Sequence, residues 1–236
     1  MKKQSDFLII IPAYNEAENI EELVIKTKQF ADVCIVNDHS QDATAEILNG
    51  FHDIHVIHHQ KNTHIPGTVL DGMKYAIEQG YKYSITMDAG LSHNPDELPL
   101  FINQSEADLV IGFRKMKINT PYFRKLLSLI GNYIYNVALD FPKRLLNADP
   151  YYRDISSGYR RYSNRTMKLL LSRKLQSKSF DFLIESAFHI YQAGFSISEV
   201  AIIYKFSNSS LNARVVKDCL EMSTKLMLNS RQIITT

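Results

Sequence analysis

The chain is poor in the residues that mark several common protein classes. Its 236 residues include two cysteines, Cys34 and Cys219, and no tryptophan. Two cysteines are too few for a disulfide framework, so a small secreted scaffold is not expected. The formal net charge is only +2. So little excess charge gives no overall attraction for nucleic acid, and we expect no nucleic-acid partner.

Long hydrophobic runs are also missing. The longest uncharged stretch in the middle of the chain, residues 126–139, is interrupted by Ser128, Asn132 and Asn136. It falls short of the roughly 20 apolar residues that span a bilayer. The N-terminus carries no signal-peptide pattern. We therefore expect a cytoplasmic protein, either soluble or peripheral at the inner face of the membrane.

The glycine signatures of two nucleotide-binding classes are absent. Neither of the strand-like runs at 7–11 and 33–36 is followed by G-x-G-x-x-G, or by G-x-x-x-x-G-K and a serine or threonine. A dehydrogenase and a P-loop NTPase are therefore disfavoured.

The chain does contain a regular alternation of strand-like and helical segments. With 45% apolar residues it can bury a sizeable core. Alternation at this spacing predicts an α/β fold, with a mostly parallel sheet flanked by helices. The expected strands of the first half are 7–11, 33–36, 54–58, 83–87 and 108–112, and the expected helices are 17–29, 42–49, 67–79 and 95–103.

Polar side chains follow the first two expected strands at the point where each strand ends. Pro12-Ala-Tyr-Asn-Glu16 follows the first strand, and Asp38 and Ser40 follow the second. Open α/β sheets bind ligands at the carboxyl ends of neighbouring parallel strands. We also expect Ser40 to cap the helix over 42–49, and Asn94, which precedes a proline, to cap the helix over 95–103.

These and later motifs together resemble family 2 glycosyltransferases. Asp154-Ile-Ser-Ser-Gly-Tyr-Arg160 is similar to D-x-T-S-G-F-R, the mark of the branch that glycosylates polyprenyl phosphates, typified by dolichol-phosphate mannosyltransferase. The ordered set covers about the first 205 residues. Its other members are Pro12–Glu16 (P-x-Y-N-E), Asn37–Asp42 (D-D-x-S-x-D), Thr86–Pro95 (M-D-A-D-L-S-H-P-P), Val110–Arg114 (V-I-G-S-R) and the acidic Glu185.

The resemblance implies a GT-A-type, Rossmann-like fold in a single domain over 1–236. Residues 1–112 would form the nucleotide-sugar-binding half, and residues 113–236 the acceptor-binding half with its C-terminal helix. The implied reaction moves a sugar, with inversion, from a nucleotide-diphosphate donor to a polyprenyl phosphate or a membrane-associated glycan intermediate.

The resemblance also assigns the donor site. Pro12, Tyr14, Glu16 and Asp38 would line the base and ribose, with Asp38 accepting from the N–H of the base. A carboxylate there discriminates because it is left unpaired when the ring N–H is absent. From the residues alone, the alternative is that Glu16 and Asp38 are acidic groups at helix N-termini, where such groups are favourable.

Asp88 follows an expected strand and is the implied ligand of a divalent cation, Mg²⁺ or Mn²⁺, on the donor diphosphate. The second aspartate of the family's metal motif is Gly90 in this chain. The metal site would therefore rely on one carboxylate, borrow Ser92 or His93, or be absent.

Four further residues are assigned to phosphate or acceptor binding: Arg114, Arg124, Ser157 and Arg160. Guanidinium groups match phosphate oxygens and stay charged. For each of the first two arginines the alternative is a solvated basic face.

Asp154 is the expected general base, and Glu185 is the alternative. A phosphate acceptor is already largely ionised at neutral pH and hardly needs a base, in which case Asp154 would only orient it or help to close the site.

Gly90 raises a second function: a non-catalytic nucleotide-sugar-binding partner of a glycosyltransferase complex. Asn208-Ser-Ser-Leu211 stands where prenyl-phosphate enzymes carry Gly-x-Ser-Lys, which slightly favours a glycan acceptor. The basic, tyrosine-rich flanks of 122–146 make it the better candidate for membrane contact. The C-terminal helix is expected to pack on its own domain.

Overall fold

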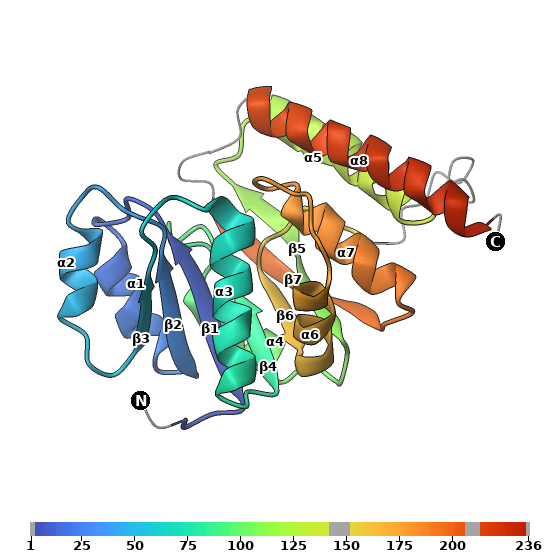
Figure 1. Cartoon of the computed structure of the whole chain (residues 1–236). Coiled ribbons are helices and arrows are strands. Elements are labelled where there is room, and N and C mark those ends of the chain that lie inside the picture. Colours follow the sequence, from blue (N-terminus) through green and yellow to red (C-terminus); the bar gives the residue numbers. More distant parts are fainter. Residues whose placement is uncertain (1–2, 142–151, 206–212, 235–236) are drawn as a thin grey trace.

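The computed structural model describes residues 3–141, 152–205 and 213–234, without the side chains of Arg124 and of residues 230–234. Its strands form one sheet in the order β3-β2-β1-β4-β6-β5-β7 (Figure 1). Pairing is parallel except that β6 runs antiparallel to β4 and β5. The strands are β1 (Phe7–Ala13), β2 (Asp32–Asn37), β3 (His55–His58), β4 (Tyr83–Thr86), β5 (Leu109–Ile118), β6 (Arg160–Ser163) and β7 (Ile197–Lys205). The predicted α/β fold with a mostly parallel sheet is confirmed.

Helices cover both faces of the sheet, which is why the first strand is apolar at every position. Alternate side chains of a strand point to opposite faces. Ile9 and Ile11 pack with Leu23 of α1, whereas Leu8 and Ile10 pack with Met73 of α3. The helices are α1 (Ile20–Thr27), α2 (Thr44–Asn49), α3 (His64–Glu78), the 3-10 turn η1 (Pro95–Glu97), α4 (Leu98–Ile102), α5 (Tyr122–Leu139), α6 (Asn164–Ser172), α7 (Phe182–Gln192) and α8 (Ala213–Ile234).

The two predicted helix caps have different outcomes. Asn94 is confirmed, since its side chain accepts from the backbone N–H of Asp96 and Pro95 occupies the first helical position. The prediction for Ser40 is wrong. Its hydroxyl accepts instead from the backbone N–H of Asn15, and α2 begins after Ala43 with no side-chain cap.

Helices α5 and α8 form a separate layer beyond the carboxyl ends of the sheet, and α7 packs between this layer and the sheet (Figure 1). The long helices α5 and α8 lie side by side. Cys219, Met222 and Leu226 of α8 are buried, and the last two pack with Ile184 and Phe188 of α7. The expectation that the C-terminal helix packs on its own domain is therefore confirmed.

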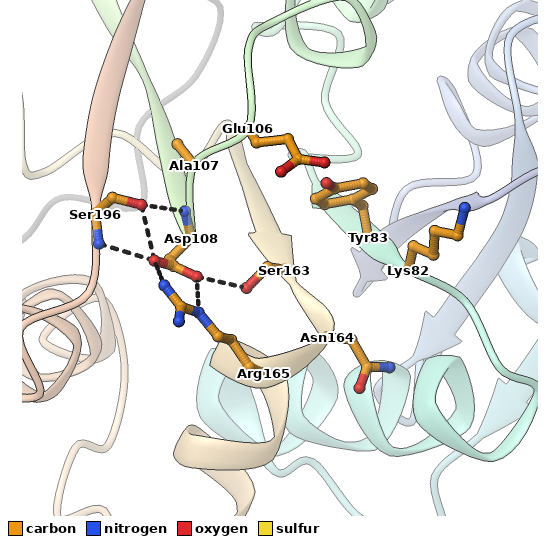
Figure 2. Close-up of a pocket in the computed structure, with 9 residues that line it drawn as sticks. All are labelled: Lys82, Tyr83, Glu106, Ala107, Asp108, Ser163, Asn164, Arg165 and Ser196. Carbon is orange, nitrogen blue, oxygen red and sulfur yellow. Dashed lines mark hydrogen bonds and ion pairs between the residues drawn. The ribbon is translucent and has the colours of Figure 1, made fainter.

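At the other end of the strands, Asp108 lies just before β5 and holds neighbouring segments together. Figure 2 shows its carboxylate accepting from Arg165, Ser163 and Ser196, which come from three neighbouring segments. The hollow around this cluster has a volume of about 520 Å³. Because the cluster lies at the ends of the strands away from the motif loops, we interpret it as a structural brace.

Candidate functional site

A large cavity lies between the carboxyl ends of the strands and the helical layer. Its volume is about 1230 Å³. It joins the loops after β1, β2 and β4 to apolar side chains of α5, α7 and α8. Six of the predicted site residues line it: Pro12, Tyr14, Glu16, Asp38, Asp88 and Arg114.

The first two motif loops are tied together at the mouth of this cavity. The backbone N–H of Asn15, which has a left-handed φ of 56°, donates to Ser40 Oγ at 3.0 Å. In the same way the N–H of Glu16 donates to Thr44 and that of Ala17 to Asp42. The polar residues of the second loop therefore set the conformation of the first. Tyr14, which is 48% exposed, is left facing the cavity.

Asp38 is more heavily engaged than its predicted role implies. Its Oδ1 accepts from the N–H and hydroxyl of Thr63 at 2.7 and 3.0 Å, and lies 2.9 Å from His59 Nδ1. Its Oδ2 accepts from the N–H of His64 at 2.8 Å. The carboxylate thus anchors the start of α3 as well as lining the cavity.

Asp88 lies just after β4, and the buried His93 holds its backbone in place. Its side chain is 47% exposed, whereas His93 behind it is buried. Burial lowers the pKa of His93. Its Nδ1 accepts from the backbone N–H of Asp88 at 3.1 Å, and its ring stacks on Tyr159 at 4.9 Å. The neutral imidazole therefore holds the loop without neutralising the Asp88 carboxylate.

Two glycines lie next to the carboxylates of this region, Gly158 beside Asp88 and Gly90 beside Glu16. A Cβ at Gly158 would lie 3.3 Å from Asp88 Oδ1, tighter than most such contacts. A Cβ at Gly90 would lie 3.8 Å from both carboxylate oxygens of Glu16. The position of the missing aspartate is thus bordered by a different carboxylate. Burial, followed by the charges of Asp88 and Asp42, raises the pKa of Glu16.

The structure pairs Arg114 with Asp154, two residues that were predicted to have separate roles. Arg114 Nε lies 2.6 Å from Asp154 Oδ2, and Nη2 lies 2.7 Å from Oδ1, a bidentate geometry. Ser156 binds both partners. Burial alone would raise the pKa of Asp154, but Arg114, helped by Lys117 and Ser156, holds it below its ordinary value. A carboxylate so engaged is a weak base.

The loop that carries Asp154 is clamped by two asparagines of α5. Asn132 Nδ2 donates to the carbonyls of Tyr152 and Arg153, and its Oδ1 accepts from the N–H of Ile155. Asn136 exchanges two hydrogen bonds with the backbone of Tyr152. The sequence showed these amides only as interruptions of an apolar stretch. Their spacing of four residues, on one face of a helix, was the available signal.

Ser157 and Arg160 lie behind the cavity wall. Arg160 is fully buried and donates to the carbonyls of Ser157 and Ile155 and to the hydroxyl of Ser186. Ser157 is 1% exposed, and its hydroxyl has no hydrogen-bond partner among the described residues. Neither side chain lines the cavity. We therefore interpret both as supports for the loop.

Glu185 is also buried, and its carboxylate binds backbone N–H groups of the loop before α7. Its carboxylate accepts from the N–H groups of Gln176 and Ser177, at distances of 2.8 to 3.1 Å. The residues that follow, Lys178 to Phe180, line the cavity. Glu185 therefore shapes the cavity through a loop.

Lys117 is a cavity residue that the sequence did not single out. It is half-buried, and its Nζ donates to Ser128 Oγ of α5 at 2.8 Å. Burial, followed by the charge of Arg114, lowers its pKa. The predicted partner Arg124 lies in α5, but its side chain is outside the described part, as is the whole of Asn208–Leu211.

Comparison with known proteins gives the chain a family context. The model of glycosyl transferase family 2 matches residues 8–168. The undecaprenyl-phosphate mannosyltransferase of Micrococcus luteus is 28% identical over 95% of both chains. The polyprenol monophosphomannose synthase of Mycolicibacterium smegmatis is 28% identical over 84% of this chain and 76% of that protein. A UDP-N-acetylglucosamine–dolichyl-phosphate N-acetylglucosaminyltransferase of Methanococcus voltae is 29% identical, covering 82% of this chain and 83% of that protein.

The fold has a solved counterpart. The crystal structure of glucosyl-3-phosphoglycerate synthase from Mycobacterium tuberculosis, in complex with Mn²⁺, UDP and glucosyl-3-phosphoglycerate, aligns with a TM-score of 0.67. The alignment covers 94% of this chain and 77% of that chain at 13% identity. The likeness confirms the predicted GT-A-type fold.

Proposed function

The chain belongs to glycosyl transferase family 2, and on that premise we propose that it moves a sugar from a nucleotide-diphosphate donor to the phosphate of a polyprenyl lipid. The observation that carries the proposal is the cavity. Its strand-end side is lined by charged groups, and its other end is apolar. Leu127, Ile130 and Ile134 of α5 line that apolar end together with residues of α8. A lipid phosphate has the same division into charge and hydrocarbon.

The donor nucleotide is assigned to the strand-end loops. Pro12 and Tyr14 offer apolar and aromatic surface for the base and ribose. Asp38 Oδ2 accepts a single hydrogen bond from the described residues, so it keeps capacity to accept from an N–H of the base.

The residues beside Gly90 fit a divalent cation. Asp88 and Glu16 supply hard oxygen ligands, which Mg²⁺ and Mn²⁺ prefer, and the diphosphate and waters complete such a shell. We assign the place of the missing aspartate to Glu16, whose oxygens border the Gly90 position. A bound cation would neutralise charge on the leaving diphosphate.

The proposed reaction is a single in-line displacement with inversion. An oxygen of the acceptor phosphate attacks the anomeric carbon, the bond from that carbon to the donor phosphate oxygen breaks, and the nucleoside diphosphate leaves. A phosphate monoester is largely ionised near pH 7, so no proton has to be removed. Four cationic residues line the cavity on the acceptor side: Arg114, Lys117, Lys178 and Arg214.

We assign positioning roles to Asp154 and Glu185. Asp154 holds the Arg114 guanidinium in one orientation through the bidentate pair. Glu185 holds the loop that precedes α7. Neither has to act as a base if the acceptor is a phosphate.

A lipid acceptor implies work at a membrane surface, and we propose the cytoplasmic face. Both cysteines are free and buried, in keeping with a reducing compartment. Across the described ranges, no helix combines the length and apolarity needed to cross a bilayer. Among the relatives, the names give mannose or N-acetylglucosamine as the sugar, so we propose a hexose of this kind without choosing between them.

Calorimetric titration with UDP, GDP, CDP and dTDP, each with and without Mn²⁺, tests the donor assignment. We expect one nucleotide to bind and to bind more tightly with metal. If none of the four binds, the assignment of the two loops is wrong.

The alternative is a non-catalytic nucleotide-sugar-binding partner, and Gly90 is the observation that favours it. Such a protein would bind the nucleotide but gain turnover only when Gly90→Asp restores the second aspartate. A competent enzyme already turns over, and the same substitution changes only its response to metal.

A further inference from the structure

Helix α5 exposes an apolar face that the helical layer does not cover. The large hydrophobic residues of its first three turns are well exposed, up to 84% for Tyr122 and 69% for Leu129. Residues 122, 126, 129 and 133 follow one another at helical spacing, so these side chains form one stripe. The members of the stripe and its border are Tyr122, Leu126, Leu127, Leu129, Ile130 and Tyr133.

The stripe continues into the cavity. Leu127 and Ile130 are 38% and 50% exposed, and both also line the cavity. On the neighbouring helix α8, Leu220 is 46% exposed and lines the cavity as well. The mouth of the proposed acceptor site is therefore rimmed by the exposed apolar side chains of two helices.

The segment that carries the stripe has charge of one sign, and on α8 the acidic Asp218 and Glu221 are paired with Arg214 and Lys217. Residues 113–139 contain no aspartate or glutamate. Lys115 and Lys125 are exposed, at the end of β5 and in the first turn of α5. Basic residues beside an exposed apolar helix face are attracted to anionic lipid headgroups.

We propose that the α5 stripe is the surface by which the protein docks on an anionic lipid bilayer. Docking there seats Leu126 and Leu129 at the level of the acyl chains and sets Lys115 and Lys125 against the headgroups. The mouth of the cavity then opens on the bilayer, and a lipid phosphate enters from the side without leaving it. A protein partner on the same stripe would cover Leu127, Ile130 and Leu220, and would close the mouth.

The inference rests on the proposed function only for the identity of the molecule that enters the cavity. Docking itself is measured without donor or acceptor. The test is flotation of the full chain with vesicles of phosphatidylcholine alone, and with vesicles that also contain phosphatidylglycerol.

The test variant is Leu126→Gln with Leu129→Gln. The matched control is Ile25→Gln with Leu100→Gln, two residues that are each 45% exposed on α1 and α4. We expect wild type and control to float with the anionic vesicles, and binding to weaken as salt is added. The α5 variant should bind at least about tenfold more weakly, because two leucines no longer enter the bilayer. Unchanged thermal melting of both variants shows that they fold.

Three results would overturn the inference. The first is failure of the wild type to bind anionic vesicles, and the second is equal binding by the α5 variant and the wild type. The third is a dimer of the wild type that the α5 substitutions dissociate, while no variant binds vesicles.

Sugar transfer to a short-chain, water-soluble prenyl phosphate tests the proposed function separately from membrane docking. The α5 variant should keep that activity. Vesicle binding without any transfer would refute the proposed function and leave the docking surface in place.

Discussion

At the scale of single residues, Arg114, a charged residue that lines the cavity, is paired with the buried Asp154. Arg114 and Asp154 are 40 positions apart in sequence and share two short hydrogen bonds. The pairing lowers the pKa of Asp154 although the residue is buried. A predicted base and a predicted phosphate ligand thus become one unit, in which the carboxylate fixes the direction of the guanidinium.

Asp154→Asn should therefore lower turnover by about 10- to 100-fold, the effect of a displaced positioning group. Nucleotide affinity should not change. The defect should be the same from about pH 6 to pH 9, because positioning does not depend on proton removal. Steady-state kinetics across this range measure it. A defect that shrinks as pH rises, when the acceptor ionises without help, would assign Asp154 as the general base after all.

The region around Gly90 gives a second residue-scale prediction. A side chain fits there, but the new carboxylate of Gly90→Asp would lie beside Glu16 and Asp88. Repulsion among three carboxylates should lower the melting temperature in EDTA, and Mn²⁺ should restore it. Gly90→Asn, which has the same size and no charge, is the control and should show little of either effect. Equal melting of the two variants in EDTA and in Mn²⁺ would argue against a cation at this position.

At the scale of elements, α5 positions the loop that carries Asp154. Asn132 and Asn136 are buried and bind the backbone of residues 152–155. Glu199 of β7 accepts from the N–H of Arg153 on the other side. The Asp154 loop is thus held between a helix and a strand, although it has no regular structure of its own around Asp154.

Asn132→Ala should cost about 1 to 3 kcal/mol of stability, because buried backbone groups lose their partners. It should also lower turnover, since Asp154 and its partner Arg114 are no longer held. Asn229→Ala, at an exposed position of α8, is the control. Urea unfolding and initial rates measure the two effects. Loss of stability with normal turnover would show that the hydrogen bonds of Asn132 stabilise the fold but are not needed for catalysis.

The Asp108 cluster at the amino end of β5 gives a pH prediction. Hydrogen bonds from Arg165, then those from Ser196 and Ser163, hold the pKa of Asp108 well below its ordinary value. Since the folded pKa lies below the unfolded value of about 4, the cluster stabilises the fold fully above that pH. The stabilisation is lost as pH falls further. The difference in free energy of unfolding between wild type and Asp108→Asn should therefore shrink steadily below about pH 4. A constant difference down to about pH 3 would contradict this origin.

The elements differ in how well the sequence predicts them. The apolar runs of β1 and β2 were predicted because burial on both faces requires them. Strand β6 was missed because Arg160 and Arg161 make it look solvated. Both are buried, and Arg161 donates to the carbonyls of Phe101 and Gln104. Such partners come from distant segments, and no local pattern reveals them. The same limit hid the pairing of Arg114 with Asp154.

At the scale of the whole molecule, the cavity joins a polar side built by the strand-end loops to an apolar side built by α5 and α8. Motif order alone predicted the polar side of the cavity, since six of the residues that it singled out line the cavity. The apolar side could not be predicted in this way, since an apolar helix face looks the same whether it packs on the domain, lines a cavity or meets lipid.

Transfer of a sugar to a polyprenyl phosphate can be measured directly. The purified full chain is incubated with polyprenyl phosphate, Mn²⁺ and each nucleotide sugar in turn, and the lipid is analysed by mass spectrometry. We expect one glycosylated lipid phosphate, formed in equal amount with the released nucleoside diphosphate. Tight nucleotide binding with unchanged lipid for every donor would contradict it, and would favour the non-catalytic partner.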